Sequence, residues 1–100
     1  MRDLSKITIE DFQKYKSGHF TIRFTPEVEL IAELTEINEL KLHSESTRLP
    51  FSLIFRTEQK NEYYPQSTFI LIHPESGEIP VFMVPIGPDD QGMRYEAIFS

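Results

Sequence analysis

The chain has 100 residues and carries ten basic and sixteen acidic side chains, for a formal net charge of -6. This length holds one small domain, placed over residues 1–100, and the acidic balance argues against binding to nucleic-acid phosphates or to an anionic membrane. The lack of cysteine excludes disulfides, a thiolate zinc site and a cysteine nucleophile. Neither a leader peptide nor an apolar run of about 20 residues is found, so the sequence predicts a cytoplasmic location.

The first expected element is a short helix near the N-terminus. Thr8 and Asp11 have the spacing of a capping box, with aspartate in the acidic role, and Gly18 is placed to end the helix. Phe12 and Tyr15 would form its one apolar edge. A helix of this length is not stable alone in water, so we expect it to pack on the rest of the chain.

Two strands are expected next. Apolar and polar residues alternate over 19–24 and again over 28–34, and a turn at 25–27 separates the two runs. Ile31 is the exception to the second alternation. A helix remains an alternative for 28–34, because three apolar residues also have helical spacing; they are Leu30, Leu34 and Ile37.

The alternation is interrupted and then resumes, which indicates a bend or bulge. The interruption covers 35–38, and the pattern returns at Leu40 and Leu42. A polar loop is expected over 43–50, followed by a strand over 51–56. One face of that strand would hold Phe51, Leu53 and Phe55.

The next two strands are apolar on both faces. They cover 68–73 and 79–86, follow a charged loop at 57–64, and are joined by a turn at 74–78. Strands of this kind must be covered on both sides. One face can join the core, and the other needs the N-terminal helix or another molecule.

A tight turn over 87–92 and a last strand over 94–99 complete the pattern. The fold class is therefore mostly β (α+β): a strongly curved antiparallel sheet or small barrel of about six strands with one N-terminal helix. Short loops favour a meander, in which strands that follow one another in the chain are neighbours in the sheet.

Motifs of known chemistry are missing. The four glycines lack the spacing of a phosphate-binding loop, and His19, His43 and His73 have no recognisable ligand spacing. We expect His73 to anchor the turn after it, and the acidic segment 89–92 to be a simple turn rather than a calcium loop. The sequence predicts no catalytic residue, no metal and no cofactor, and therefore no enzyme.

Two arginines in the second half of the chain lie at strand ends. For Arg56 and Arg94 we expect pairing with Glu96 or the C-terminal carboxylate, with anion binding as the alternative. Segment 27–45 holds six glutamates against one lysine. It is either a solvated face or a docking surface for a basic partner.

Four segments together resemble a family of small bacterial domains of unknown function with a C-terminal Gly-Met-Arg-Tyr-Glu-Ala-x-Phe signature. They are Pro50–Arg56, His73–Gly77, Phe82–Asp89 and Gly92–Phe99. The resemblance runs the full length and implies strands rather than a helix at 28–34. Relatives are often encoded near proteins similar to phage tail-collar or tail-fibre components, and the family offers no catalytic residues to transfer.

The two-sided hairpin over 68–86 favours a non-enzymatic protein-interaction or accessory module, and the resemblance implies a phage-tail-like or fibre-related assembly. Its partner would be another protein or a second copy, and exposed sheet edges would allow strand addition. The alternative is a small-molecule-binding β-barrel that uses Arg56, His73 and Arg94 in its interior or mouth. The residues of the candidate surface are Arg56, Ile70, Ile72, His73, Phe82, Val84, Arg94 and Glu96.

Overall fold

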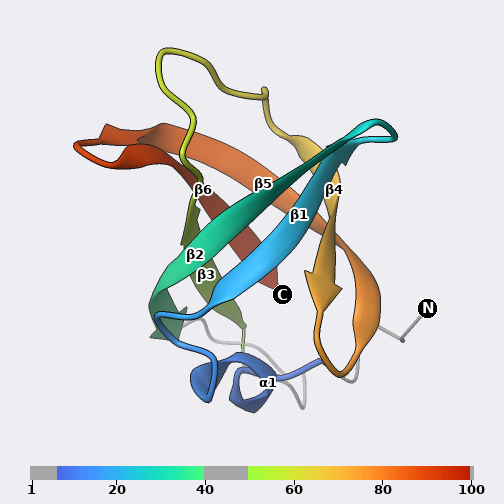
Figure 1. Ribbon diagram of the computed structural model, residues 1–100. Coiled ribbons are helices and arrows are strands. Elements are labelled where there is room, and N and C mark those ends of the chain that lie inside the picture. The colour runs from blue at the N-terminus through green and yellow to red at the C-terminus, as the bar shows by residue number, and fades with distance from the viewer. Residues whose placement is uncertain (1–6, 40–49, 100) are drawn as a thin grey trace.

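The computed structural model describes residues 7–39 and 50–99. In this part of the chain, six strands close into an antiparallel barrel with the spatial order β1-β2-β3-β6-β5-β4 (Figure 1). The strands are β1 (His19–Thr25), β2 (Val28–Glu39), β3 (Phe51–Arg56), β4 (Ser67–His73), β5 (Gly77–Asp89) and β6 (Gly92–Phe99). One short helix, α1 (Glu10–Gln13), precedes them. The prediction of a mostly β fold with about six strands and one N-terminal helix is confirmed.

The order of the strands differs from a meander. β3 pairs with β6, with Phe55 opposite Tyr95, and β1 pairs with β4, with Ile22 opposite Leu71. The prediction of a meander is wrong because the segment 57–66 is long enough to cross one end of the barrel between β3 and β4 (Figure 1). Every described strand has a strand on both sides, but residues 28–32 of β2 pair with β1 alone and residues 77–82 of β5 pair with β4 alone.

β2 is a strand throughout, which decides against the helical alternative for 28–34. The register of its pairing with β3 shifts between Leu34 and Glu36, so the expected bulge is confirmed. The predicted resumption of the pattern at Leu40 and Leu42 lies outside the described residues, as does most of the predicted loop over 43–50.

The barrel interior is filled by aromatic and aliphatic side chains. Near one end, the Phe24 ring stacks on Tyr64 with 4.8 Å between ring centroids and lies 5.2 Å from Tyr95. Near the other end, Phe51 and Phe99 stack with 4.6 Å between their centroids. Interior side chains alternate with outward ones along β1 and β4, and bulges interrupt the alternation in β2 and β5. Packing of these rings is the main source of stability.

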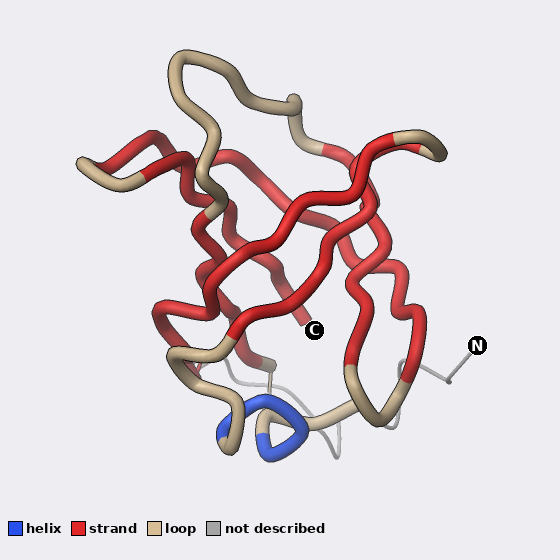
Figure 2. Tube along the Cα trace, viewed as in Figure 1, coloured by secondary structure: helices blue, strands red, loops and turns tan. Residues whose placement is uncertain are grey.

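The helix covers the end of the barrel rather than the outer face of the hairpin over 68–86 (Figures 1 and 2). It is shorter than predicted, although Asp11 Oδ2 accepts the Thr8 backbone N–H at 2.8 Å, as in a capping box. The Phe12 side chain of this helix is fully buried, and its ring centroid lies 5.4 Å from that of Phe99. The chain then turns through Ser17, whose φ is +68°, into β1.

β5 extends beyond its predicted end. The sequence predicts a tight turn over 87–92, but the strand continues to Asp89 and the turn contains only residues 90 and 91. A register shift between Pro85 and Gly87 lets the strand bend, and Gly87 adopts a φ of +106° that favours glycine. Because this bulge lets β5 continue past Gly87, the predicted end of the strand is wrong.

The Tyr95 hydroxyl holds the segment 57–66 over the barrel end. It donates to Gln59 Oε1 at 2.7 Å and accepts the Tyr64 backbone N–H at 3.0 Å. The side chain is fully buried. Burial raises the pKa of Tyr95 above its ordinary value.

We predict that Tyr95→Phe lowers the free energy of unfolding by about 1–2 kcal/mol at neutral pH, because Gln59 and the Tyr64 N–H lose their partner. A raised pKa for Tyr95 in the folded state means that the unfolded chain ionises first, above about pH 10, and wild-type stability falls there. The difference in the free energy of unfolding between wild type and variant should therefore become smaller as the pH rises above about 10. Urea denaturation at neutral and alkaline pH measures both effects.

Tyr63→Phe is the matched control, because the Tyr63 side chain is 58% exposed. It should change the free energy of unfolding by less than about 0.5 kcal/mol at any pH. If the difference in the free energy of unfolding between wild type and Tyr95→Phe stays constant across the alkaline range, this would contradict the role of the buried hydroxyl.

Candidate functional site

The outward side chains of β4, β5 and β6 form an apolar surface, here called the β4–β6 face. Its members are Ile70, Pro80, Phe82, Val84, Glu96 and Ile98. Ile70 lies opposite Pro80, and Phe82 lies beside Ile98, because the preceding pair in register is Met83 with Ala97. Phe82 is 44% exposed and Ile98 is 40% exposed. The hairpin is therefore apolar on both sides, with its outer side in contact with solvent.

Two further candidates lie at the margins of this face. Ile72 is partly buried on the outer side of β4, opposite Thr21 of β1. Arg94 lies on the outer side of β6, and its Nε donates to the Gly87 carbonyl at 3.2 Å. The structure therefore brings most of the predicted surface residues onto one wall of the barrel.

Glu96 is the charged member of the β4–β6 face. It lies between Val84 of β5 and Ile54 of β3, and it is partly buried. No cation of residues 7–39 or 50–99 forms an ion pair with it. The carboxylate thus has apolar residues opposite it on both neighbouring strands and Arg94 two residues before it on the same side of β6, and it forms no ion pair with a described residue.

Arg56 is paired, but with other partners than those predicted. Its guanidinium donates to Glu33 Oε1 at 2.8 Å and to Asp89 Oδ2 at 3.0 Å. The prediction of pairing with Glu96 is wrong because β2 places Glu33 directly opposite Arg56. The C-terminal carboxylate lies outside the described residues.

Asp89 organises the turn between β5 and β6. Its Oδ1 accepts the backbone N–H groups of Gln91 and Gly92 at 2.8 and 3.0 Å. The Gln91 N–H is the main cause that lowers the pKa of Asp89, and Arg56 and the Gly92 N–H lower it further. The interpretation of 89–92 as an acidic turn is confirmed.

His73 is buried inside the barrel end and connects three segments. Its Nδ1 accepts the backbone N–H groups of Glu75 and Ser76 at 3.0 and 3.1 Å. The other ring nitrogen therefore carries the proton and donates to the Asp11 carbonyl at 2.7 Å. The predicted anchoring of the turn is confirmed, and His73 also holds the segment of α1.

The three polar residues of the ligand-binding alternative do not meet. His73 points into the core, whereas Arg56 and Arg94 lie on the outer wall, opposite one another on β3 and β6. Within the described ranges no group of three His, Asp or Glu side chains is placed to hold a metal ion. His19 is exposed on β1, and His43 lies outside these ranges.

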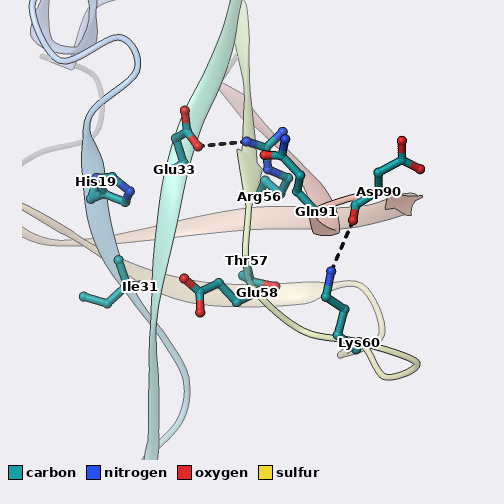
Figure 3. Close-up of a pocket in the computed structure, with 9 residues that line it drawn as sticks. All are labelled: His19, Ile31, Glu33, Arg56, Thr57, Glu58, Lys60, Asp90 and Gln91. Carbon is teal, nitrogen blue, oxygen red and sulfur yellow. Dashed lines mark hydrogen bonds and ion pairs between the residues drawn. The ribbon is translucent and has the colours of Figure 1, made fainter.

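A hollow on the opposite wall was missed by the sequence analysis. It measures about 460 Å³ and lies between the outer side of β1 and β2 and the segment 57–66. Figure 3 shows His19 and Ile31 on one side of it and Glu58 and Lys60 on the other. A second hollow of about 540 Å³ shares His19, Ile31 and Glu58 with the first. We call the two together the Ile31 groove.

The sequence contained one signal for this groove. Ile31 interrupts the alternation of β2, and in the structure it is 60% exposed. The pattern showed an apolar residue at an outward position. It could not show that 57–66 faces this residue, because the two segments are distant in the sequence and meet only in the folded chain.

Comparison with known proteins places residues 7–99 under the family model of a domain of unknown function, DUF6916. No curated protein and no solved structure matches the chain. Of the described residues, no helix is both long and apolar enough to cross a membrane.

Proposed function

Because the chain belongs to DUF6916, a family of domains of unknown function, we propose its function from the surface of the barrel: it is a non-enzymatic protein-interaction module. The module binds another protein through the β4–β6 face. The observation that carries this proposal is the contiguous apolar surface on the outer side of a sheet whose inner side already forms the core. Apolar patches with a polar rim are typical of protein-binding surfaces.

The apolar side chains supply the favourable free energy of binding. Phe82 and Ile98 are the most exposed members of the face and lie side by side. Burying a side chain of this size contributes about 1.5–3 kcal/mol, and aromatic residues are enriched at the centres of interfaces. The partner contacts the outward side chains of this face.

The charge of the face defines the chemistry of the partner. Glu96 has apolar residues opposite it on both neighbouring strands and forms no ion pair with a described residue, and burial of an unpaired carboxylate is costly. The partner therefore presents an apolar surface with a lysine or arginine that reaches Glu96. A second copy fits less well, because each chain has a net charge of -6. An accessory role in a phage-tail-like or fibre-related assembly, which the resemblance implies, is consistent with such a module.

The test is capture of partners from a lysate of the organism that encodes the chain, with wild type and three variants. Phe82→Ser removes the aromatic ring, and Glu96→Lys reverses the central charge. Tyr63→Ser is the matched control, since it removes an exposed aromatic side chain that lies outside both the β4–β6 face and the Ile31 groove. Circular dichroism and thermal unfolding check that every variant remains folded.

We expect a stoichiometric partner whose recovery falls by at least about tenfold with Phe82→Ser and with Glu96→Lys, and which Tyr63→Ser retains. Capture that is equal for wild type and Phe82→Ser would overturn the proposal. Recovery of only the chain itself, together with a dimer in analytical ultracentrifugation that Phe82→Ser dissociates, would replace the partner by a second copy.

A further inference from the structure

We infer that the Ile31 groove is a second docking surface, which binds a basic segment of another protein. An apolar side chain of that segment packs on Ile31, and lysine or arginine side chains on either side of it pair with Glu58 and Glu62. This site lies on β1, β2, the end of β3, the segment 57–66 and the turn between β5 and β6, and none of its lining residues belongs to the β4–β6 face.

The apolar contact point is Ile31. It is the most exposed large apolar side chain of the described residues, at 60%. Its outward neighbours along β2 are Glu29 and Glu33, so the apolar surface is flanked by carboxylates along the strand. The two hollows that meet over Ile31 give a partner side chain room to lie against it.

The charges of the groove select a basic partner. Five carboxylates line the two hollows, against two cations, Arg56 and Lys60. Arg56 already lies between Glu33 and Asp89, and Lys60 Nζ donates to the Asp90 carbonyl at 3.3 Å. Arg56 is therefore already paired, and the remaining cation, Lys60, is outnumbered by the carboxylates of the groove.

The carboxylates that remain define where the partner's cations bind. Glu29 is paired with Arg23 at 2.9 Å, and Glu33 is paired with Arg56. Glu58 and Glu62 form no ion pair with any residue that the structure describes. They come from the same segment, and they face the groove that Ile31 lines.

The binding mode follows from the side chains that line the groove. Around Ile31, β2 is paired with β1, and its pairing with β3 begins only at Glu33. The contacts proposed here are made by apolar and acidic side chains, which predicts modest affinity and strong dependence on salt.

The experiment is a titration of the ¹⁵N-labelled protein, followed by NMR, with three peptides that differ only in side chains. The probe is Lys-Leu-Lys-Leu-Lys; Lys-Ser-Lys-Ser-Lys lacks the apolar contact, and Glu-Leu-Glu-Leu-Glu lacks the cations. We expect the first peptide to bind with a dissociation constant below about 1 mM at low salt and to shift the amide signals around Ile31, Glu58 and Glu62. The other two should bind at least about tenfold more weakly.

Variants assign the binding to the groove. Ile31→Thr keeps the β-branched side chain and should weaken binding of the first peptide about tenfold. The double change Glu58→Gln with Glu62→Gln should weaken it about fivefold and reduce its salt dependence. The matched control is Glu36→Gln with Glu39→Gln, which removes the same charge from exposed positions of β2 outside the groove.

Three results would overturn the inference: no binding of the first peptide at millimolar concentration, equal binding of the acidic peptide, or equal losses in the groove and control variants. Binding that is lost with Phe82→Ser and kept with Ile31→Thr would instead assign the peptide to the β4–β6 face. The two surfaces are thus tested separately, and failure of one leaves the other intact.

Discussion

Replacement of Phe12 by alanine should lower the free energy of unfolding by about 3–5 kcal/mol, the range for loss of a fully buried phenylalanine. Phe12 is fully buried, and its ring lies 5.3 to 6.1 Å from those of Phe20, Phe51, His73 and Phe99. The short helix has no other fully buried side chain, so its attachment to the barrel depends on this ring. Urea denaturation, followed by circular dichroism, measures the loss.

Phe82→Ala is the control for this result. It removes the same ring from a position that is 44% exposed, and it should cost less than about 1 kcal/mol. Hydrogen exchange gives a second measurement, because loss of the Phe12 contacts should expose amides around His73 while the strands remain protected. Similar costs for the two variants would show that the helix does not contribute to the core.

Gly92→Ala should be the second most damaging substitution, with a loss of about 3 kcal/mol or more in the free energy of unfolding. A Cβ atom at Gly92 would lie 1.7 Å from the Thr57 carbonyl oxygen and 2.8 Å from its carbonyl carbon. The obstacle is backbone, so no side-chain rotation relieves it. The start of the segment 57–66 must move away from β6, and the 2.9 Å hydrogen bond from the Thr57 N–H to the Met93 carbonyl is lost.

Gly77→Ala separates this clash from the general effect of replacing a glycine. Gly77 has a φ of +75°, and a Cβ there meets nothing within 4 Å. The strained backbone alone should cost about 1 kcal/mol. Chemical denaturation of both variants makes the comparison, and a Gly92→Ala cost no greater than that of Gly77→Ala would contradict the close approach of Thr57.

The local elements could be predicted because each pattern depends on neighbouring residues. Alternation over 19–24 placed inward and outward side chains correctly, and the predicted inner face of 51–56 is part of the core, although the other side of that strand is buried as well. The two-sided apolar pattern over 68–86 correctly indicated a hairpin whose second side lies outside the core. Thr8 and Asp11 lie at the start of the helix, but its N-cap is Ile9 and no side chain caps it.

The parts that were missed depend on residues distant in the chain. Nothing local in 51–56 indicates that its neighbours are β2 and β6, so the ion pair of Arg56 with Glu33 could not be foreseen. The helix is shorter than its pattern because it ends at Gln13, directly after the buried Phe12, and the chain then turns toward β1. The Ile31 groove depends on the path of 57–66 across the barrel end, which only the closed topology determines.

The closed barrel also determines how long unpaired strand edges, which promote aggregation, remain exposed during synthesis. The ribosome releases β1, β2 and β3 first, and the outer edges of this three-stranded unit pair with β4 and β6. β6 follows the other described strands in the chain, so β3 keeps an open edge until residues 92–99 have emerged. A chain that terminates before β6 therefore presents open edges of both β3 and β5, and it is a substrate for chaperones and proteases rather than a smaller folded barrel.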